Sequence, residues 1–176
     1  MSADYKPSPH SDDRPPNTTI DMIVVHNISL PPGEFGGGYV QSFFCGHLDA
    51  SLHSYFETIA SLKVSSHLFI DRHGNVTQFV PFAKRAWHAG VSNFKGRERC
   101  NDFSIGIELE GTDDLPYEAI QYQTLARVIQ QLMVMYPAIH RSHMVGHSDI
   151  APVRKTDPGP AFDWAYLNKL LDELKG

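Results

Sequence analysis

The chain has 176 residues, of which 41% are hydrophobic, and a formal net charge of -5 at pH 7. This length suits one domain with a single sizeable core, so residues 1–176 are treated as one unit. An acidic chain without clusters of Lys and Arg does not fit a protein that mainly binds nucleic acid. No stretch approaches the ~20 apolar residues of a membrane span, so membrane insertion is not expected.

The N-terminus and the cysteines predict the compartment. The first residues are polar, contain proline and lack the apolar segment of a secretory signal. The chain has only Cys45 and Cys100, and without an export signal reduced thiols are the expected state. We therefore expect a soluble, cytoplasmic protein with two free cysteines.

Residues 1–18 are expected to form an arm without regular structure. They are polar, show no hydrophobic periodicity and contain four prolines, Pro7, Pro9, Pro15 and Pro16. We expect this Pro-rich N-terminal arm to drape over the fold.

The next segment predicts a strand followed by a loop. The apolar run Met22–Val25 leads into His26, which predicts a strand from Thr19 to His26. Residues 31–38 include four glycines and are expected to form a mobile loop.

A helix and a hairpin are predicted after this loop. Leu52, Phe56 and Ile59 recur at helical spacing, which predicts an amphipathic helix from Asp49 to about Leu62. The β-rich runs Ser66–Asp71 and Val76–Val80 flank the turn sequence of residues 72–75 and predict a β-hairpin.

The segment Phe103–Glu110 alternates cleanly between apolar and other residues. Ile105, Ile107 and Leu109 share one face of the predicted strand, whereas Glu108 and Glu110 point together to the other face. Glu110 stands at the strand end, next to a glycine, and is expected at the surface or beside the groups that do the chemistry.

The C-terminal part predicts two helices and a short strand. A long helix is predicted from Thr112 to about Tyr136, with Pro116 in its first turn and with Ile120, Leu125, Ile129 and Leu132 on its core side. A strand from His143 to His147 and a helix from about Phe162 to Leu174 follow. The order is that of an α/β protein, without internal repeat or linker.

A possible metal site is indicated by the segment from Val145 to Pro160. His147 offers a neutral nitrogen and Asp157 an anionic oxygen, a combination that suits zinc, and the loop between them lets both turn toward one ion. His26, at the end of a buried strand, is the best candidate for a third ligand. Each of these residues alone is more often structural, but their joint occurrence at element ends favours the metal site.

The other histidines have simpler interpretations. His143 and His147 form an HxxxH pair, but Met144 stands where a zincin has its glutamate. His67 and His88 lie beside apolar residues at a possible groove wall, where a structural histidine is the more frequent case. His140 and His143 lie in a polar connection and are expected at the surface, and no chemistry is expected from His47, His53 and His73.

Four segments together resemble the AmpD family of 1,6-anhydro-N-acetylmuramyl-L-alanine amidases. They are residues 24–37, 84–90, 96–112 and 146–164, and the similarity extends over nearly the whole chain, with residues 1–6 and the tail after Tyr166 as its weaker ends. The resemblance implies an α/β single domain with a central mixed β-sheet flanked by helices. Lysozymes of the phage T7 type and peptidoglycan recognition proteins share this fold.

The resemblance also implies the roles of the site residues. His26, His147 and Asp157 are then the ligands of one Zn²⁺ ion, and Glu108 and Lys155 are the catalytic pair. Zinc with three protein ligands keeps a position for water, Glu108 is the expected base, and Lys155 is expected beside the developing oxyanion unless it is an ordinary surface lysine.

The chain departs from the related lysozymes and recognition proteins at two positions. Those proteins usually have a cysteine as the third ligand and a tyrosine just before the residue that matches His67. Asp157 and Ser66 occupy these positions here. The work of the tyrosine must then fall to another group, and Glu108 is the available one.

Contacts with substrate are expected from several residues around these groups. Trp87 offers an apolar wall to a sugar or belongs to the core, and Lys63 and Arg154 meet carboxylates of a peptide or are surface charges. The resemblance implies that Asn27, Lys63, Ala151 and Arg154 lie near the substrate. The full expected set also includes Trp87, His88 and Leu109.

The substrate implied by the resemblance is an anhydro-muropeptide. Cleavage is expected between the lactyl group of 1,6-anhydro-N-acetylmuramic acid and L-alanine, in cytoplasmic peptidoglycan recycling, by a monomer that needs no nucleic acid or membrane partner. Two alternatives stay open: a peptidoglycan-binding module without activity, and a broad-range amidase that acts on intact peptidoglycan.

Overall fold

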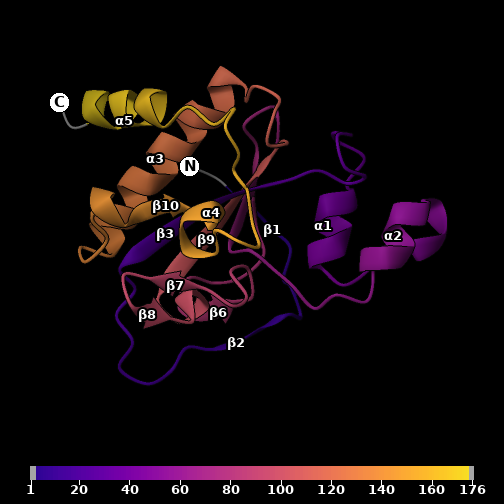
Figure 1. The fold of residues 1–176 in the computed structure, drawn as a ribbon, viewed down its shortest axis with the longest axis horizontal. Helices are drawn as coiled ribbons and strands as arrows, with labels where there is room; N and C mark the ends of the chain where they lie inside the picture. Colours follow the sequence, from indigo (N-terminus) through magenta and orange to yellow (C-terminus); the bar gives the residue numbers. More distant parts are fainter. Residues whose placement is uncertain (1–2, 175–176) are drawn as a thin grey trace.

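A six-stranded mixed sheet forms the centre of the computed structural model, which describes residues 3–174 (Figure 1). Strands β4, β9, β3 and β10 run parallel, β5 is antiparallel to β4, and β1 is parallel to β5. The order across the sheet is β1 (Asp4–Tyr5), β5 (Val76–Gln78), β4 (Leu68–Ile70), β9 (Ser104–Glu110), β3 (Met22–Ile28) and β10 (Met144–Gly146). The expected α/β fold with a central mixed sheet is thereby confirmed.

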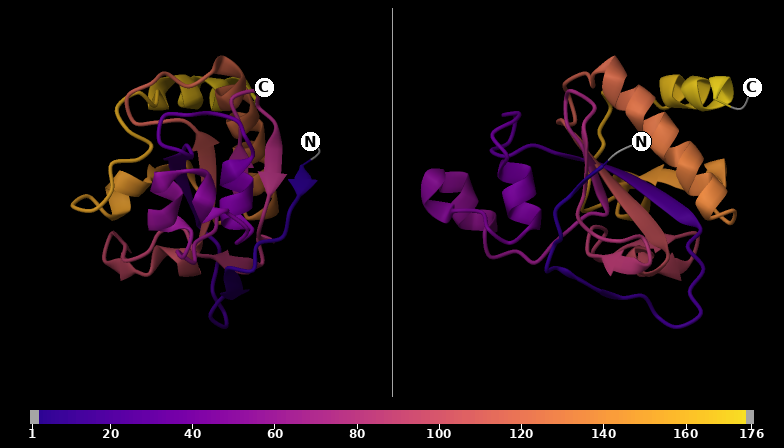
Figure 2. Two further views of the ribbon diagram at one scale, coloured as in Figure 1. Left: turned by 90° about the vertical axis from the view of Figure 1, so that its right-hand side faces the viewer. Right: turned by 180° about the vertical axis from the view of Figure 1, so that it is seen from behind.

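One face of the sheet is covered by α3 (Ala119–Met135) and α5 (Trp164–Glu173), which pack against each other (Figure 2). The apolar odd-numbered residues of β3 and β9 belong to the largest hydrophobic cluster, which they form together with side chains of the two helices. They are Ile23, Val25, Ile105, Ile107 and Leu109 on the strands and Leu125, Ile129, Leu167 and Leu171 on the helices.

The opposite face carries two smaller clusters. One lies under α1 (Tyr39–Phe44) and α2 (Ser54–Ile59) and includes Phe69 of β4. The other contains Met22 and Val24 of β3 and is covered by the segment from Ala89 to Phe103 and by α4 (His147–Ile150). This segment holds the hairpin of β7 (Asn93–Phe94) and β8 (Arg97–Glu98) and the 3₁₀ helix Cys100–Asp102.

The strand that carries His26 is shifted relative to the prediction. It begins at Met22 and continues to Ile28, so His26 lies inside the strand rather than at its end. All seven residues of β9 are buried, because both sheet faces are covered. The predicted hairpin and the short strand before His147 are confirmed.

The single helix predicted for residues 49–62 is wrong. A 3₁₀ helix, Ala50–Leu52, is followed by α2, and His53 between them has extended backbone. The His53 side chain accepts a hydrogen bond from the Tyr55 N–H and thereby caps α2. Leu52 is consequently exposed, and α1 before this region had no clear periodic signal.

The long helix begins seven residues later than predicted. Glu118 is its N-cap and forms a reciprocal capping box with Gln121, so the segment from Thr112 to Pro116 is a loop. Ile120 is 39% exposed instead of buried in the core, whereas Leu125, Ile129 and Leu132 are buried as predicted.

The prediction that the N-terminal arm has no regular structure is wrong, because the arm contains two short strands. Its strand β1 extends the central sheet, and β2 (Ser11–Asp13) pairs with β6 (Lys84–Ala86) in antiparallel fashion. Proline removes backbone donors, but none of the four prolines falls within either short strand.

Two further expectations concern the whole chain. Cys45 and Cys100 are both free in the structure. Within residues 3–174, the longest apolar helices fall short of what crossing a membrane requires.

Arg14 anchors the arm, and its replacement tests that role. Its guanidinium donates to the carbonyls of Phe82, Asn101, Asp102 and Ser104. We expect Arg14→Ala to lower the free energy of unfolding by about 3 kcal/mol in urea titrations, since each buried acceptor left unsatisfied costs roughly 1–3 kcal/mol.

Lys84→Ala is the matched control for this experiment. Lys84 pairs with Asp13 of the same arm, but both side chains are exposed, and such a pair contributes less than about 1 kcal/mol. Equal effects of the two substitutions would contradict the anchoring role of Arg14.

Candidate active site and metal centre

Strand register brings three chemical groups to one level of the sheet. His26 of β3 pairs with Glu108 of β9, and Gly146 of β10 pairs with Val25, so that His147 emerges beside His26. Paired residues of parallel strands point to the same face, here the one opposite α3. Adjacent parallel strands end at a common edge, which is where α/β proteins place their sites.

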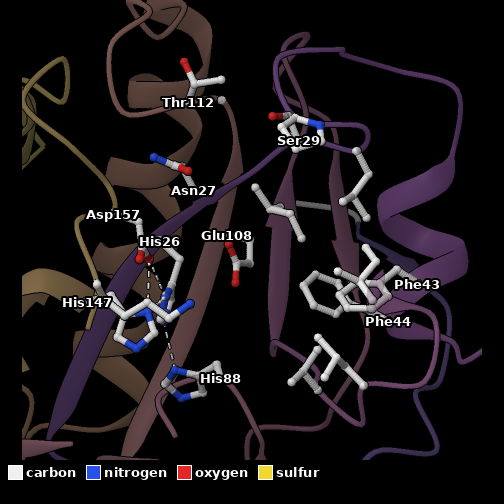
Figure 3. A pocket seen from close by; sticks show the side chains of 18 of the residues that line it. His26, Asn27, Ser29, Phe43, Phe44, His88, Glu108, Thr112, His147 and Asp157 are labelled. Carbon is white, nitrogen blue, oxygen red and sulfur yellow. Dashed lines mark hydrogen bonds and ion pairs between the residues drawn. The ribbon is translucent and has the colours of Figure 1, made fainter. Parts of the chain in front are cut away.

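His26, His147 and Asp157 form one cluster of potential metal ligands (Figure 3). Nδ1 of His26 lies 3.0 Å from Nδ1 of His147 and 2.9 Å from Oδ2 of Asp157, and the third distance is 3.2 Å. Asp157 is brought back to the sheet because its carbonyl accepts a hydrogen bond from the Ser148 N–H. The structure thus brings together all three predicted ligands.

The donor set suits a zinc ion. Nε2 of His147 lies 3.0 Å from the Ala89 carbonyl oxygen, which can only accept, so this nitrogen carries the proton and Nδ1 is left with its lone pair. Two imidazole nitrogens and one carboxylate oxygen are typical of three-ligand zinc sites. Burial lowers the pKa of His26 to about 4, so that its imidazole is neutral at pH 7, the form that binds metal.

Glu108 is a buried carboxyl group that points into the cavity beside this cluster (Figure 3). Its Oε2 has no hydrogen-bond partner among the described residues. Burial raises the pKa of Glu108 well above its ordinary value; the negative charge of Asp157 adds to this, and Lys155 opposes it. A carboxyl group with a raised pKa in a cavity is a candidate general acid or base.

The cavity has a volume of about 700 Å³ and two different walls. One wall is apolar and comes from the α1–α2 region: Leu30, Phe43, Phe44, Tyr55, Ile59, Leu62 and Val64. The other wall is polar and includes the metal cluster, Thr112, Asp113 and Lys155. Sequence reasoning did not identify the apolar wall, although the adjacent aromatic residues at 43 and 44 were an available signal.

Four of the predicted substrate residues line this cavity: Asn27, Trp87, His88 and Arg154. Asn27 Nδ2 donates to Asp113 Oδ1 and to the Pro158 carbonyl, which ties together the two loops that follow β9 and α4. The Arg154 guanidinium donates to the carbonyls of Ala89 and Val91.

The other three predicted substrate residues do not reach the cavity. Leu109 is fully buried in the core under α3, because it alternates with Glu108 along β9. Lys63 is exposed and is not among the lining residues, although both of its neighbours are. Ala151 borders a separate hollow beside Val153.

Glu110 has a structural role rather than a surface position. Its carboxylate is buried and accepts hydrogen bonds from the backbone N–H groups of Gly36 and Arg72. It therefore ties the glycine-rich loop before α1 to the β4–β5 turn. His67 is also structural, since its Nδ1 accepts from the Gly106 N–H inside the sheet.

Comparison with known proteins identifies relatives along nearly the whole chain. The N-acetylmuramoyl-L-alanine amidase family model matches residues 16–160. The 1,6-anhydro-N-acetylmuramyl-L-alanine amidase AmpD of Citrobacter freundii is 59% identical over 165 residues, which cover 94% of this chain and 88% of the relative.

Solved structures of related amidases are also similar to this chain. The crystal structure of a selenomethionine AmpD derivative matches with a TM-score of 0.93 and 58% identity, over 96% of this chain and 94% of the other. AmiD from Escherichia coli, in complex with the substrate anhydro-N-acetylmuramic acid-L-Ala-D-γ-Glu-L-Lys, matches with a TM-score of 0.63 and 30% identity, over 89% of this chain and 60% of the other.

The burial of Glu108 predicts a pH-dependent gain in stability for Glu108→Gln in the metal-free protein. The raised pKa means that the folded state holds the proton of Glu108 more tightly than the unfolded state does. The wild-type protein therefore loses no stability from this group below the ordinary pKa of 4.5, and loses more as the pH rises toward the pKa of the folded state. We expect the free energy of unfolding of the variant to be about 1–3 kcal/mol higher than that of the wild type near pH 8. This is the usual cost of burying a polar group without a hydrogen-bond partner.

Urea titrations at several pH values, with a chelator present, measure this difference. Glu173→Gln is the control, because Glu173 is exposed and its carboxylate forms an exposed ion pair with Lys169, one turn earlier in α5. A Glu108→Gln gain that is the same at pH 4 and pH 8 would contradict the raised pKa.

Proposed function

The chain belongs to the N-acetylmuramoyl-L-alanine amidase family, and we propose that it hydrolyses the amide bond between 1,6-anhydro-N-acetylmuramic acid and L-alanine in muropeptides. The observation that carries this proposal is the convergence of His26, His147 and Asp157 beside the buried Glu108 at the base of a large cavity. The similarity to AmpD along 94% of the chain supports the choice of substrate.

The proposed chemistry requires one zinc ion, held by His26, His147 and Asp157. When bound, zinc makes water acidic near neutral pH and polarises a carbonyl group. The raised pKa of Glu108 suits it to accept the proton of the attacking water and then deliver it to the departing alanine nitrogen. Lys155 contributes a positive charge on the polar wall, where the carbonyl oxygen becomes negative.

The shape of the cavity agrees with a muropeptide. Its volume lies within the range of small-molecule sites, and its two walls differ in polarity. The apolar wall suits the ring face of an anhydro sugar, whereas the polar wall suits a peptide with carboxylates. The bond to be cleaved joins these two halves of the substrate.

A role in cytoplasmic peptidoglycan recycling follows from this substrate as a further part of the proposal. Anhydro-muropeptides are degradation products of the cell wall, and an enzyme that frees their peptide allows the parts to be reused. Activity in the soluble fraction of cells, with none in the envelope fraction, is the expected distribution.

The two alternatives are disfavoured by specific observations. A binding module without activity has no need of three potential ligands beside a buried carboxyl group whose Oε2 is unpaired in the described part of the chain. A broad-range amidase is disfavoured by the 59% identity to AmpD, whose name specifies the 1,6-anhydro sugar, along 94% of this chain.

Hydrolysis assays with two substrates test the proposed function. We expect the purified protein to release free tripeptide from anhydro-muramyl tripeptide, with at least about tenfold preference over the non-anhydro counterpart, as mass spectrometry of the products measures. A chelator should abolish the reaction and added zinc restore it. Equal cleavage of both substrates would favour the broad-range amidase, and zinc binding without cleavage would favour the binding module.

Two substitutions separate metal binding from proton transfer. Asp157→Ala should lose both zinc and activity, because one ligand of three is removed. Glu108→Gln should keep zinc but lose about a hundredfold or more in kcat, the usual contribution of a general acid–base group. Zinc content by atomic emission and turnover by product analysis give both values, and near-normal turnover of Glu108→Gln would assign proton transfer to another residue.

A further inference from the structure

His88 is buried against the candidate metal centre, and both of its ring nitrogens are engaged. Its Nδ1 lies 2.9 Å from Nε2 of His26 (Figure 3). Its Nε2 lies 3.2 Å from Oγ of Ser104. The ring also lies directly over Gly106 of β9, where a Cβ atom would approach its Cγ to 2.4 Å. The backbone of β9 is therefore shaped to accommodate this imidazole.

The direction of each hydrogen bond in this chain can be assigned. Ser104 Oγ is 2.6 Å from the Cys100 carbonyl oxygen, which can only accept, so the serine proton is used there. Ser104 must then accept from Nε2–H of His88. A neutral imidazole has one N–H, so Nδ1 of His88 accepts from Nε2–H of His26.

This assignment determines the state of the metal-facing nitrogen of His26. With its proton on Nε2, His26 presents a bare lone pair at Nδ1 toward Asp157 and His147. The other tautomer would place a proton at Nδ1, where Asp157 Oδ2 is an available acceptor at 2.9 Å, and would prevent ligation. His88 and Asp157 therefore compete for the one proton of His26.

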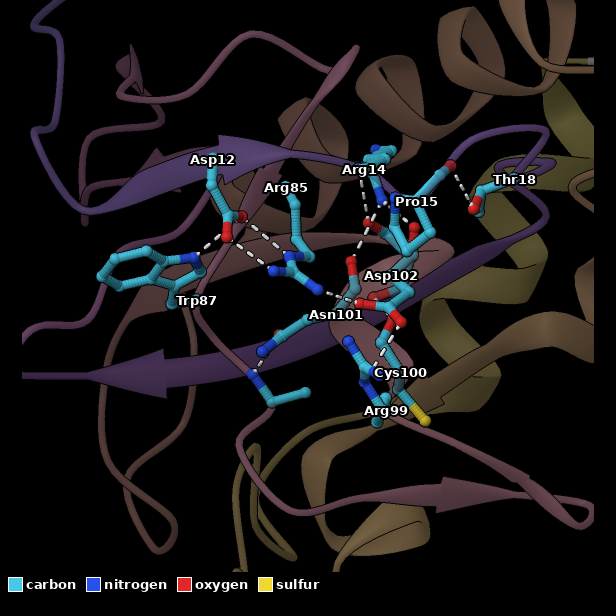
Figure 4. A network of polar contacts seen from close by, with 12 residues as sticks. Asp12, Arg14, Pro15, Thr18, Arg85, Trp87, Arg99, Cys100, Asn101 and Asp102 are labelled. Atoms are coloured by element: carbon cyan, nitrogen blue, oxygen red, sulfur yellow. Dashed lines mark hydrogen bonds and ion pairs between the residues drawn. The ribbon is translucent and has the colours of Figure 1, made fainter.

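Ala89, the residue after His88, determines the tautomer of the other candidate histidine ligand, His147. The Ala89 carbonyl accepts from Nε2 of His147, so two consecutive residues set both tautomers. Their backbone is held by Asn101, whose Oδ1 accepts from the N–H groups of His88 and Ala89. An ion-paired network of Asp12, Arg85 and Asp102 surrounds this segment, and the Trp87 indole donates to Asp12 (Figure 4).

We propose that His88 is a positioning residue of the metal centre, which, through Ser104, holds His26 in the tautomer that ligates the ion. The proposal rests on the proposed function for the identity of the metal, but the tautomer itself is a property of the metal-free protein. His88 acts through His26 and needs no contact with substrate.

The first test reads the tautomer without metal. In metal-free protein labelled with ¹⁵N in the histidine rings, long-range ¹H–¹⁵N spectra should show His26 protonated at Nε2, with signals assigned by means of His26→Gln. In His88→Leu the acceptor is lost, and the proton should move to Nδ1, where Asp157 accepts it. An unchanged Nε2–H tautomer in His88→Leu would overturn the proposal.

The second test compares zinc affinities of matched variants by competition with a chelating dye. His88→Leu should weaken zinc binding about 10–100-fold, the usual effect of removing a partner of a ligand histidine. His88→Asn places Oδ1 near the position of Nδ1, so it should keep the Nε2–H tautomer and restore most of the affinity. If packing alone mattered, leucine would be tolerated at least as well as asparagine, and that order would refute the proposal.

Ser104→Ala provides a further variant in case His88→Leu does not fold. It leaves the imidazole in place but removes the acceptor for its Nε2–H, so we expect a mixture of His26 tautomers and weaker zinc binding. A pure Nε2–H tautomer with wild-type affinity would contradict the proposal. If the wild-type protein binds no zinc, the proposed function fails, whereas equal zinc affinity of wild type and His88→Leu would refute only the role of His88.

Discussion

The register of three parallel strands is the constraint on which the site depends. Because β10, β3 and β9 are neighbours in the sheet, His147, His26 and Glu108 reach the same face at the same level. A slip of one residue in β9 would turn Glu108 into the core under α3 and bring an apolar side chain to the cavity. The strand pairing that buries Ile105 and Ile107 therefore also directs the carboxyl group of Glu108 into the cavity. The same register determines both the packing of the core and the position of this group.

Burial changes the pKa values of the histidine and of the carboxyl group in this site in opposite directions, and both changes agree with the proposed chemistry. Removal from water lowers the pKa of His26 and raises the pKa of Glu108, so at neutral pH the histidine is an uncharged donor and the carboxyl group holds its proton more readily. Burial thus suits His26 to bind a metal and Glu108 to exchange a proton, on two paired positions of neighbouring strands. The cost is a buried carboxyl oxygen of Glu108 that has no hydrogen-bond partner within residues 3–174.

Sequence patterns predicted the elements that have a strong period and failed where local capping or distant contacts decide. Alternation in residues 103–110 correctly separated Glu108 from the core, although the same alternation argues against a substrate contact by Leu109. The helix predicted from Asp49 is interrupted because His53 caps a new helix, and the long helix starts at Glu118 because of its capping box. The partners of the N-terminal arm lie some seventy residues away along the chain, beyond any local pattern.

The importance of distant contacts also explains how much of the candidate site could be predicted from the sequence. Metal ligands and Glu108 are identified by chemical type and by family resemblance, and the structure brings the ligands together. The orientation of those ligands depends on acceptors with no chemical signature, such as the Ala89 carbonyl and the hydroxyl of Ser104. The segment that carries His88 and Ala89 is held by Asn101 and by Arg85, which pairs with Asp12 of the arm. An arm predicted to have no regular structure therefore helps to hold the segment beside the candidate metal centre, and the surroundings of a histidine ligand determine which tautomer it adopts.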